Sequence, residues 1–402
     1  GLFELNGATP LSNGVNFTTH TRHGTSCELL LFHSGEEEPF AVLPFPNACR
    51  IGDVYSMIVM GLDIEDLEYG YRVDGPYEPE KGHIFDKTKV LLDPYAKAVA
   101  GQREWGQQKV GSYHARVVRE TFDWEDMPQS TRKISDLIIY ELHVRGFTKD
   151  THSKVKNKGT FQGVIEKIPY LKDLGINQIQ CMPVYEFEEA GMRVNYWGYG
   201  PGYYFAPKSA YAKDGDGVKG LKDLVKYCHK AGIEVVLEMP FAEGISGLMV
   251  TDCLRNYVME YHVDGFILNP YNVPMDIILK DPILTGVRIL KHAEEYQNVM
   301  RRFLKGDEGV VTDVMYQTRK RWDLEGIYNC ITTHTGFTLK DLVSYDGKHN
   351  EANGENNQDG PDYNYSWNCG AEGLTRKKAV LELRKNQMRN ALFLLLLSQG
   401  VP

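Results

Sequence analysis

The chain has 402 residues, of which 42% are hydrophobic and 25% are charged, a composition typical of a globular protein with a sizeable core and not of a disordered chain. The formal charge of −9, with no cluster of Lys and Arg interleaved with aromatic residues, argues against a nucleic-acid partner. The longest apolar run, 391–397, is far shorter than the roughly 20 residues that span a bilayer, which argues against a membrane protein.

The first hundred residues show short runs of alternating polarity, separated by turns rich in Gly, Pro and Asp. This pattern predicts antiparallel strands, and we expect them at 15–19, 27–32, 54–59 and 69–73. Regularly spaced short strands are typical of a sandwich, so residues 1–100 are predicted to form an all-β, immunoglobulin-like domain. The polar, aperiodic segment 101–133 is predicted to connect this domain to the next.

From residue 134 onwards the chain changes to alternating strands and helices. Strands are expected at 136–144, 176–184, 233–240 and 265–269, with helices at 161–174, 221–230 and 248–262 between them. Such an order predicts parallel βα units, which build either a barrel or a doubly wound sheet. Further along, 287–290 and 328–333 are candidate strands, and 376–398 is a long predicted helix.

The cysteines give information about the cellular compartment and about metals. Their number is odd, they are dispersed along the chain, and no two of them form a CxxC pair. The seven cysteines are Cys27, Cys49, Cys181, Cys228, Cys253, Cys330 and Cys369. This favours reduced thiols in a cytoplasmic protein over a disulfide framework or a zinc site. We therefore expect a cytoplasmic location, no metal and no cofactor.

Several motifs resemble those of known carbohydrate-active proteins. GVNF at 14–17, YGYRVDGPY at 69–77 and LDPYAK at 92–97 resemble carbohydrate-binding module family 48, as found before debranching enzymes. IYELHVRGFT at 139–148, NYWGY at 195–199, RRFLKGD at 301–307 and KHNEANGENN at 348–357 resemble glycoside hydrolase family 13, of the isoamylase and glycogen-debranching type.

The resemblance implies a fold. Members of this family carry a (β/α)8 TIM barrel, so we expect the barrel over residues 134–402, after the sandwich. When the chain is matched to the family's barrel, residues 398–402 correspond to the beginning of the eighth strand. We therefore expect an incomplete barrel and a chain that is part of a longer polypeptide.

The resemblance also identifies the catalytic positions, and the residues there differ from the family's. Retaining glycosidases use one carboxylate as the nucleophile and a second as the acid. The nucleophile position is Asn269, the acid position is His292, and the third carboxylate position is Thr335. An amide carries no negative charge and cannot attack the anomeric carbon as a carboxylate does. The resemblance thus predicts no competent catalytic residue.

The resemblance also implies positions that bind sugar. Trp197 and Tyr199 stand where the family stacks a glucose ring, and His334 stands where it bonds a sugar hydroxyl. The alternatives are that the aromatic residues only fill the barrel rim and that His334 is structural. A rebuilt acid and base remain possible among Glu186, Glu188, Glu189, Glu238 and Glu243, provided that two of them lie about 5–5.5 Å apart.

Three hypotheses follow for the function. The first is a protein of glycogen or starch metabolism that binds α-glucan without hydrolysing it and meets an active glucan enzyme as a partner. The second is an active hydrolase that cleaves α-1,6 branch linkages with relocated carboxylates. The third is a protein that retains the fold for oligomerisation and binds no glucan.

Overall fold

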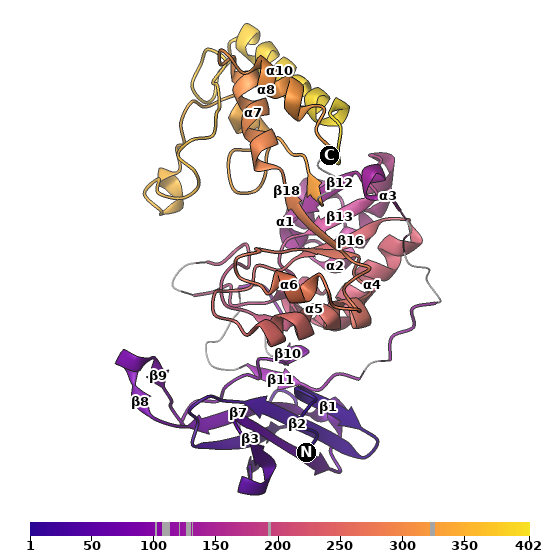
Figure 1. Cartoon of the computed structure of the whole chain (residues 1–402), viewed down its shortest axis with the longest axis vertical. Coiled ribbons are helices and arrows are strands. Elements are labelled where there is room, and N and C mark those ends of the chain that lie inside the picture. The colour runs from indigo at the N-terminus through magenta and orange to yellow at the C-terminus, as the bar shows by residue number, and fades with distance from the viewer. Residues whose placement is uncertain are drawn as a thin grey trace. The chain divides into compact units, whose positions relative to one another are not determined.

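The computed structural model describes residues 1–100, 103–106, 113–119, 121–125, 130, 132–191, 194–321 and 326–402. Contacts divide the chain into two compact units. The first unit comprises Gly1–Ser130 and Tyr140–Arg288, and the second comprises Thr131–Ile139 and Ile289–Pro402. In Figure 1 the first unit runs from indigo to orange, and most of the second is orange to yellow.

The first unit begins with a β-sandwich (Figure 1). One sheet has the order β1 (Gly7–Leu11), β2 (Gly14–His20), β6 (Val54–Met60) and β5 (Arg50–Ile51). The other has the order β10 (Ala98–Ala100), β11 (His114–Arg116), β7 (Glu68–Asp74), β3 (Ser26–Phe32) and β4 (Ala41–Pro44). All of these pairings are antiparallel. The predicted all-β domain is confirmed.

The core of the sandwich consists of side chains that alternate inward along both sheets. Val15 and Phe17 from β2 meet Leu29 and Leu31 from β3, and all four are buried. β11 belongs to the second sheet although it lies within the predicted connector 101–133. A hairpin of β8 (Tyr77–Glu78) and β9 (His83–Ile84) and the short 3₁₀ turns η1 (Asn47–Cys49), η2 (Ile64–Asp66) and η3 (Pro79–Lys81) complete the domain.

The rest of the first unit contains neighbouring strands β12 (Ile139–Leu142), β13 (Gln178–Cys181), β16 (Glu234–Glu238) and β17 (Gly265–Ile267). β13, β16 and β17 pair in parallel. The helices between them are α1 (Val144–Lys149), α2 (Phe161–Glu166), α3 (Ile168–Asp173), α4 (Gly217–Lys230) and α5 (Gly247–Tyr261), followed by α6 (Met275–Ile278). An antiparallel pair, β14 (Tyr185–Glu186) and β15 (Tyr203–Pro207), and the 3₁₀ turns η5 (Thr151–Ser153) and η6 (Ser209–Tyr211) lie in the connections.

The two faces of this parallel sheet differ in polarity. Ile179, Cys181, Val235 and Leu237 point to one face and are fully buried. The opposite face carries the polar side chains Gln178, Gln180, Glu234 and Glu238. Near the start of β16, the Glu234 carboxylate accepts hydrogen bonds from the Arg288 guanidinium at 2.7 and 2.9 Å and from Gln178 at 2.8 Å. Burial raises the pKa of Glu234, but these donors outweigh it and hold that pKa below its ordinary value.

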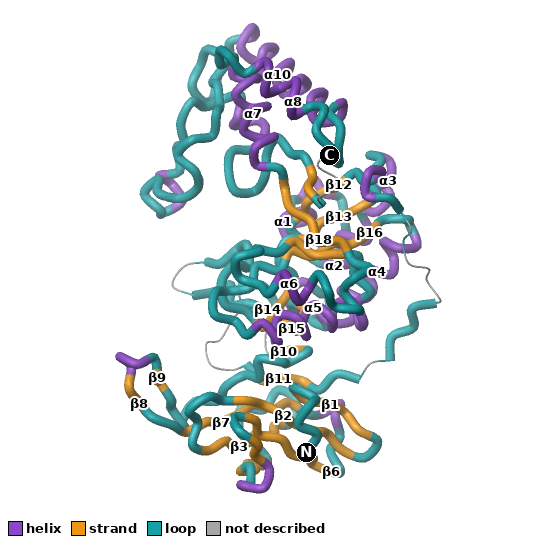
Figure 2. Tube along the Cα trace, viewed as in Figure 1, coloured by secondary structure: helices purple, strands orange, loops and turns teal. Residues whose placement is uncertain are grey.

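In the second unit, β18 (Arg288–His292) pairs in parallel with β19 (Ile327–Tyr328), and Val401 bridges to Tyr328 in the same sense. The helices are α7 (Glu294–Lys305), α8 (Val311–Gln317), α9 (Leu339–Leu342) and α10 (Lys378–Leu397), with the 3₁₀ turns η4 (Ile134–Asp136) and η8 (Glu351–Asn353). Tyr296, Met300 and Ala391 lie at the centre of its core. Figure 2 shows long loops in the part of the chain that precedes α10. Together with the first unit's βα units, these elements make up a partial (β/α)8 barrel, as predicted.

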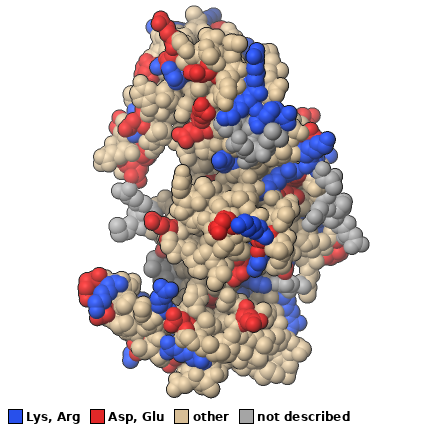
Figure 3. Space-filling view, viewed as in Figure 1, with Lys and Arg blue, Asp and Glu red and all other residues tan. Residues whose placement is uncertain are grey.

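Other expectations concern thiols, membranes and charge. The seven cysteines are all free in the structure. Among the described residues, no helix is long and apolar enough to cross a membrane. On the face drawn in Figure 3, basic and acidic side chains are both widely spread.

Candidate functional site

An aromatic loop in the first unit, residues 195–199, is held in place by its own polar groups. The Asn195 side chain accepts a hydrogen bond from the Gly198 amide at 3.0 Å and donates one to the Tyr199 carbonyl at 2.9 Å. The Tyr185 hydroxyl donates to the Gly198 carbonyl at 2.6 Å. Gly198 has φ +88°, and a Cβ there would lie 2.7 Å from the Phe187 ring, so glycine is required at this turn. The loop therefore presents Trp197 and Tyr199 on a fixed backbone.

His143 supports the aromatic loop. It follows β12 and caps α1, because its Nδ1 accepts the Gly146 amide hydrogen at 3.0 Å. The ring proton therefore lies on Nε2, which donates to the Tyr196 carbonyl at 2.9 Å. The Tyr196 ring stacks on His143 with centroids 4.4 Å apart, and Trp197 meets both rings edge-on. His143 is thus a buried histidine with both ring nitrogens hydrogen-bonded, and 41% of Trp197 remains exposed beside it.

Tyr199 connects the loop to the parallel sheet. Its hydroxyl donates a 2.9 Å hydrogen bond to Oε1 of Glu238, the last residue of β16. Burial, together with the nearby Glu238 carboxylate, raises the pKa of Tyr199, so the phenol remains a protonated donor. Barrel active sites form at this end of the strands. An exposed indole, a phenol and a carboxylate therefore gather where a sugar ring can stack and its hydroxyls can be bonded.

Two of the other candidate glutamates are engaged by a buried lysine. Lys208 is 0% exposed, and its Nζ lies 2.8 Å from Glu186 Oε1 and 2.7 Å from Glu189 Oε2. Glu186 also accepts the Ser209 amide hydrogen, and Glu189 accepts that of Gly106, both at 3.0 Å. These carboxylates are therefore used to hold β14 and β15 together and to attach the segment 103–106.

Lys208 was not predicted from the sequence as a site residue. A lysine next to the apolar run of β15 is a weak signal, and its pairing with Glu186 and Glu189 needs the strands folded against each other. Glu188 and Glu243 are exposed to solvent. Among the five glutamates considered, Glu189 contacts the aromatic loop through its backbone carbonyl, which accepts the Asn195 amide hydrogen at 3.0 Å, and Glu238 contacts it through its carboxylate.

The three positions that the resemblance implies as catalytic are divided between the two units. Asn269 lies in the first unit, exposed beyond the end of β17, and its Oδ1 accepts the Tyr271 amide hydrogen at 3.1 Å in a turn. His292 lies in the second unit as the exposed last residue of β18. Thr335 is also in the second unit, exposed, with its hydroxyl 2.9 Å from that of Thr333, and His334 beside it is half-buried. The structure thus joins Trp197 and Tyr199 on one loop and does not gather the other four positions in one unit.

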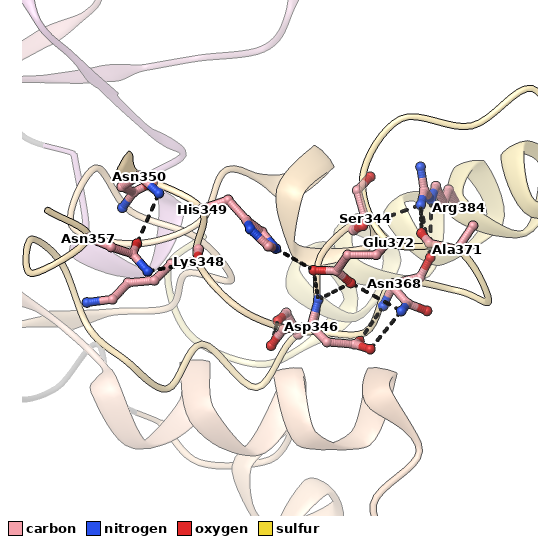
Figure 4. Close-up of polar contacts among 11 residues, drawn as sticks. Ser344, Asp346, Lys348, His349, Asn350, Asn357, Asn368, Ala371, Glu372 and Arg384 are labelled. Atoms are coloured by element: carbon pink, nitrogen blue, oxygen red, sulfur yellow. Dashed lines mark hydrogen bonds and ion pairs between the residues drawn. The ribbon is translucent and has the colours of Figure 1, made fainter. Parts of the chain in front are cut away.

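The KHNEANGENN motif lies in the second unit, in loops braced by polar contacts (Figure 4). The Glu372 carboxylate accepts hydrogen bonds from His349 Nε2 and from the Asp346 amide, both at 2.9 Å. Burial raises the pKa of Glu372, yet these donors and Asn368 hold it below its usual range, so the group stays ionised. Within the motif, Asn357 exchanges side-chain hydrogen bonds with the backbone of Lys348 and Asn350.

Arg384 attaches these loops to helix α10. Its buried guanidinium donates to the carbonyl oxygens of Gly373 at 2.7 Å, Asn368 at 3.0 Å and Ser344 at 3.3 Å, and to that of Ala371 (Figure 4). A guanidinium has five donors in a fixed fork, so one side chain can satisfy several loop carbonyls at once. The contacts described for this motif are therefore internal and shape the loop.

Two segments of the chain match the profiles of known domain families. The profile of carbohydrate-binding module 48, the isoamylase N-terminal domain, matches residues 6–96, and that of the α-amylase catalytic domain matches residues 143–241. Type I pullulanase from Bacillus subtilis, solved in complex with maltose, superposes with a TM-score of 0.72 at 18% identity, over 99% of this chain and 64% of that one. At this identity the likeness concerns the fold.

Curated relatives are more similar in sequence. The chloroplastic isoamylase 1 of Arabidopsis thaliana is 34% identical, over 100% of this chain and 68% of its own length. That alignment runs over 538 positions, 136 more than the 402 residues of this chain, so the relative has internal segments that are lacking here. The glycogen debranching enzyme of Yersinia enterocolitica is 30% identical, over 97% of this chain and 74% of its own length. The chain therefore belongs to the isoamylase and glycogen-debranching family of α-glucan metabolism.

Proposed function

We propose that this protein binds α-glucan, in the metabolism of glycogen or starch, without hydrolysing it. The proposal rests on the resemblance, which puts Asn269, His292 and Thr335 at the positions where the family has its three carboxylates. A retaining mechanism needs both a negatively charged nucleophile and a proton donor on opposite sides of the bond. With neither carboxylate in place, bound glucan would remain intact.

The remaining glutamates offer no evident replacement pair. Glu186 and Glu189 share the ammonium of Lys208 inside the protein, so neither can approach a substrate without breaking a buried ion pair. Glu238 is within reach of a ligand at the aromatic loop, but a single carboxylate cannot serve as nucleophile and acid in the same step. We infer that Glu238 bonds sugar hydroxyls instead.

The aromatic loop supports the binding half of the proposal. Asn195 and Tyr185 hold the loop backbone, the His143 and Tyr196 rings pack against Trp197, and Glu238 holds the Tyr199 hydroxyl. Little side-chain or loop entropy is therefore lost when a sugar ring stacks there. A structural neighbour of the same fold was solved with maltose, an α-glucan fragment. In the cell, this role would be that of a non-catalytic cytoplasmic partner of an active glucan enzyme.

Two assays on the purified protein test the proposal. Incubation with amylopectin and glycogen at stoichiometric protein should release no reducing ends above a buffer control. In native gels containing glycogen, the wild type should be retarded, and Trp197→Ala and Tyr199→Ala should restore most of its mobility. Tyr227→Ala, which removes an exposed aromatic side chain from helix α4, is the matched control and should stay retarded.

Each unfavourable outcome supports a different alternative. Release of reducing ends by the wild type would favour the active α-1,6 hydrolase. Unretarded migration of the wild type in glycogen would favour a purely structural role.

A further inference from the structure

A second concave site lies in the first unit, apart from the aromatic loop. It is a cavity of about 320 Å³, bounded by the sandwich, by residues 121–122 and by helix α4. The sandwich contributes Ile64, Glu65 and the stretch 116–119, and α4 contributes Lys219 and Lys222. Its volume is at the lower end of the range for small-molecule sites, which suits a ligand of about the size of a hexose derivative.

Positive charge exceeds negative charge around this cavity. Arg116, Arg119, Lys219 and Lys222 line it, together with the carboxylates of Glu65 and Asp216. The Asp216 carboxylate is already engaged, because it caps α4 by accepting the Lys219 amide hydrogen at 3.0 Å. Within the described parts of the chain, neither Arg116 nor Arg119 has an ion-pair partner within 4.0 Å.

The two lysines differ in the length of their ion pairs with carboxylates. The ammonium of Lys219 is paired with Asp223 at 2.5 Å, one turn further along α4. Lys222 is 4% exposed, and the nearest carboxylate oxygen, of Glu260, is 3.5 Å away. The lining therefore holds two guanidinium groups without an ion-pair partner among the described residues, and one buried ammonium whose ion pair is long.

The rest of the lining is apolar. Ile64, Val117, Val118 and Val218 contribute aliphatic surface, and Phe122 contributes a half-buried ring. The Phe122 ring is fixed edge-on to Trp124, with centroids 4.8 Å apart, and the Lys222 ammonium lies 5.9 Å from its centroid. The site therefore combines anion-binding groups with a fixed surface on which a sugar ring can pack.

We propose that this cavity binds the phosphate ester of a sugar. Arg116 and Arg119 would hold the phosphate, because guanidinium groups match phosphate oxygens in bidentate pairs, and Lys222 would add a further charge. The sugar would pack against Phe122 and Val118. The same chemistry is offered by a free hexose phosphate and by a phosphate ester carried on an α-glucan chain. The proposal does not depend on glucan binding at Trp197 and Tyr199.

Titration calorimetry on the full chain tests this assignment, with glucose 6-phosphate, inorganic phosphate, glucose and maltotriose 6-phosphate as ligands. Glucose 6-phosphate should bind at a single saturable site, more tightly than inorganic phosphate, with no detectable binding of glucose. The double variant Arg116→Gln/Arg119→Gln should weaken binding at least tenfold. The charge-matched control Arg22→Gln/Lys213→Gln removes two exposed cations outside the cavity and should bind as the wild type does.

A second variant leaves the charges in place. Val118→Trp fills the cavity and should abolish binding, while circular dichroism and the melting temperature check that each variant is folded. In the Trp197→Ala/Tyr199→Ala background, which removes the aromatic loop as a binder of glucan, tighter binding of maltotriose 6-phosphate than of glucose 6-phosphate would identify the glucan-borne ester as the source. The reverse order would identify the free sugar. The proposal is overturned if folded variants of both kinds bind glucose 6-phosphate like the wild type, or if glucose binds equally well.

Discussion

At the scale of single residues, Lys208 is a fully buried cation of the first unit. Its ammonium is fully buried between the carboxylates of Glu186 and Glu189, and it also donates to the Phe187 carbonyl at 2.9 Å. Buried ions are tolerated only when they are paired and hydrogen-bonded. Burial raises the pKa of Glu186, and the lysine is what opposes this rise most strongly.

Replacing this lysine should therefore be costly. Lys208→Met keeps the length of the side chain but leaves two carboxylates buried without their cation, and we expect the free energy of unfolding to fall by about 3–5 kcal/mol. Urea denaturation followed by fluorescence measures the change. Lys219→Met is the control, because it breaks an exposed pair with Asp223 that is worth about 0–1 kcal/mol. Equal losses for both variants would contradict a special role for Lys208.

Asn269 allows a direct test of the catalytic chemistry. Asn269→Asp puts a carboxylate where the resemblance implies the family's nucleophile, yet we expect no hydrolysis, because the resemblance implies that His292 stands at the acid position. The measurement is the release of reducing ends from amylopectin, with the wild type in parallel. Activity in the single variant would mean that another residue, such as Glu238, already supplies the proton.

At the scale of elements, strand β17 depends on a close approach of its backbone to Arg288. A Cβ at Gly265 would lie 2.3 Å from the Arg288 carbonyl oxygen and 2.8 Å from its Cβ. The approach is needed because the Arg288 amide donates to the Asp264 carbonyl at 2.9 Å, just before β17 begins. Backbone cannot move aside as a flexible side chain can, so glycine is required at this point of the sheet.

The substitution Gly265→Ala should consequently destabilise the first unit. Overpacking of this kind costs about 1–3 kcal/mol. Gly286→Ala is a matched control, since nothing lies within 4 Å of a Cβ at that position and its φ is not in the left-handed region. Chemical denaturation should show a lower midpoint for Gly265→Ala and a change within about 0.5 kcal/mol for Gly286→Ala. A shift of the same size in both would show that the contact is absent in solution.

At the scale of the whole molecule, the chain contains two units that each bury their own core. Phe17, Leu29 and Leu31 are buried in the sandwich of the first unit, and Tyr296, Met300 and Ala391 are buried in the second. Multi-unit chains commonly depart from a single two-state transition, because separate cores can melt at different temperatures.

We therefore expect differential scanning calorimetry to resolve more than one unfolding transition. Met300→Ala should lower the stability of the second unit by about 2–5 kcal/mol and move one transition, whereas Leu29→Ala should move another. A single transition that both variants shift equally would mean that the two units unfold together.

The sequence predicted the regular elements where the pattern is local. Helix α10 (Lys378–Leu397) was expected at 376–398, and α4 (Gly217–Lys230) extends the helix expected at 221–230 because Asp216 caps its first turn. The single helix expected at 161–174 is instead α2 and α3. Pro169 lies in the first turn of α3, and proline has no amide hydrogen and is accepted there but not inside a continuous helix.

Long-range pairing was harder to foresee. β11 adds residues 114–116 to the sandwich because they pair with β7 and β10, which no local pattern reveals. The strand expected at 265–269 ends at Ile267, and Asn269 lies in a turn that its own side chain forms with Tyr271. Asn side chains form such turns readily in competition with strand pairing.

The sequence by itself determined which chemical groups this protein has, because the identity of a side chain sets its charge and its hydrogen-bonding capacity. The amide of Asn269, for example, carries no negative charge and is a poor nucleophile. Only the tertiary structure decided which of these groups are bound to other parts of the protein and which can contact a ligand. Lys208 engages Glu186 and Glu189, Tyr199 meets Glu238, and Arg116 and Arg119 face a cavity without a carboxylate partner among the described residues. Burial and partner choice depend on residues far apart in the chain, so folding sets them.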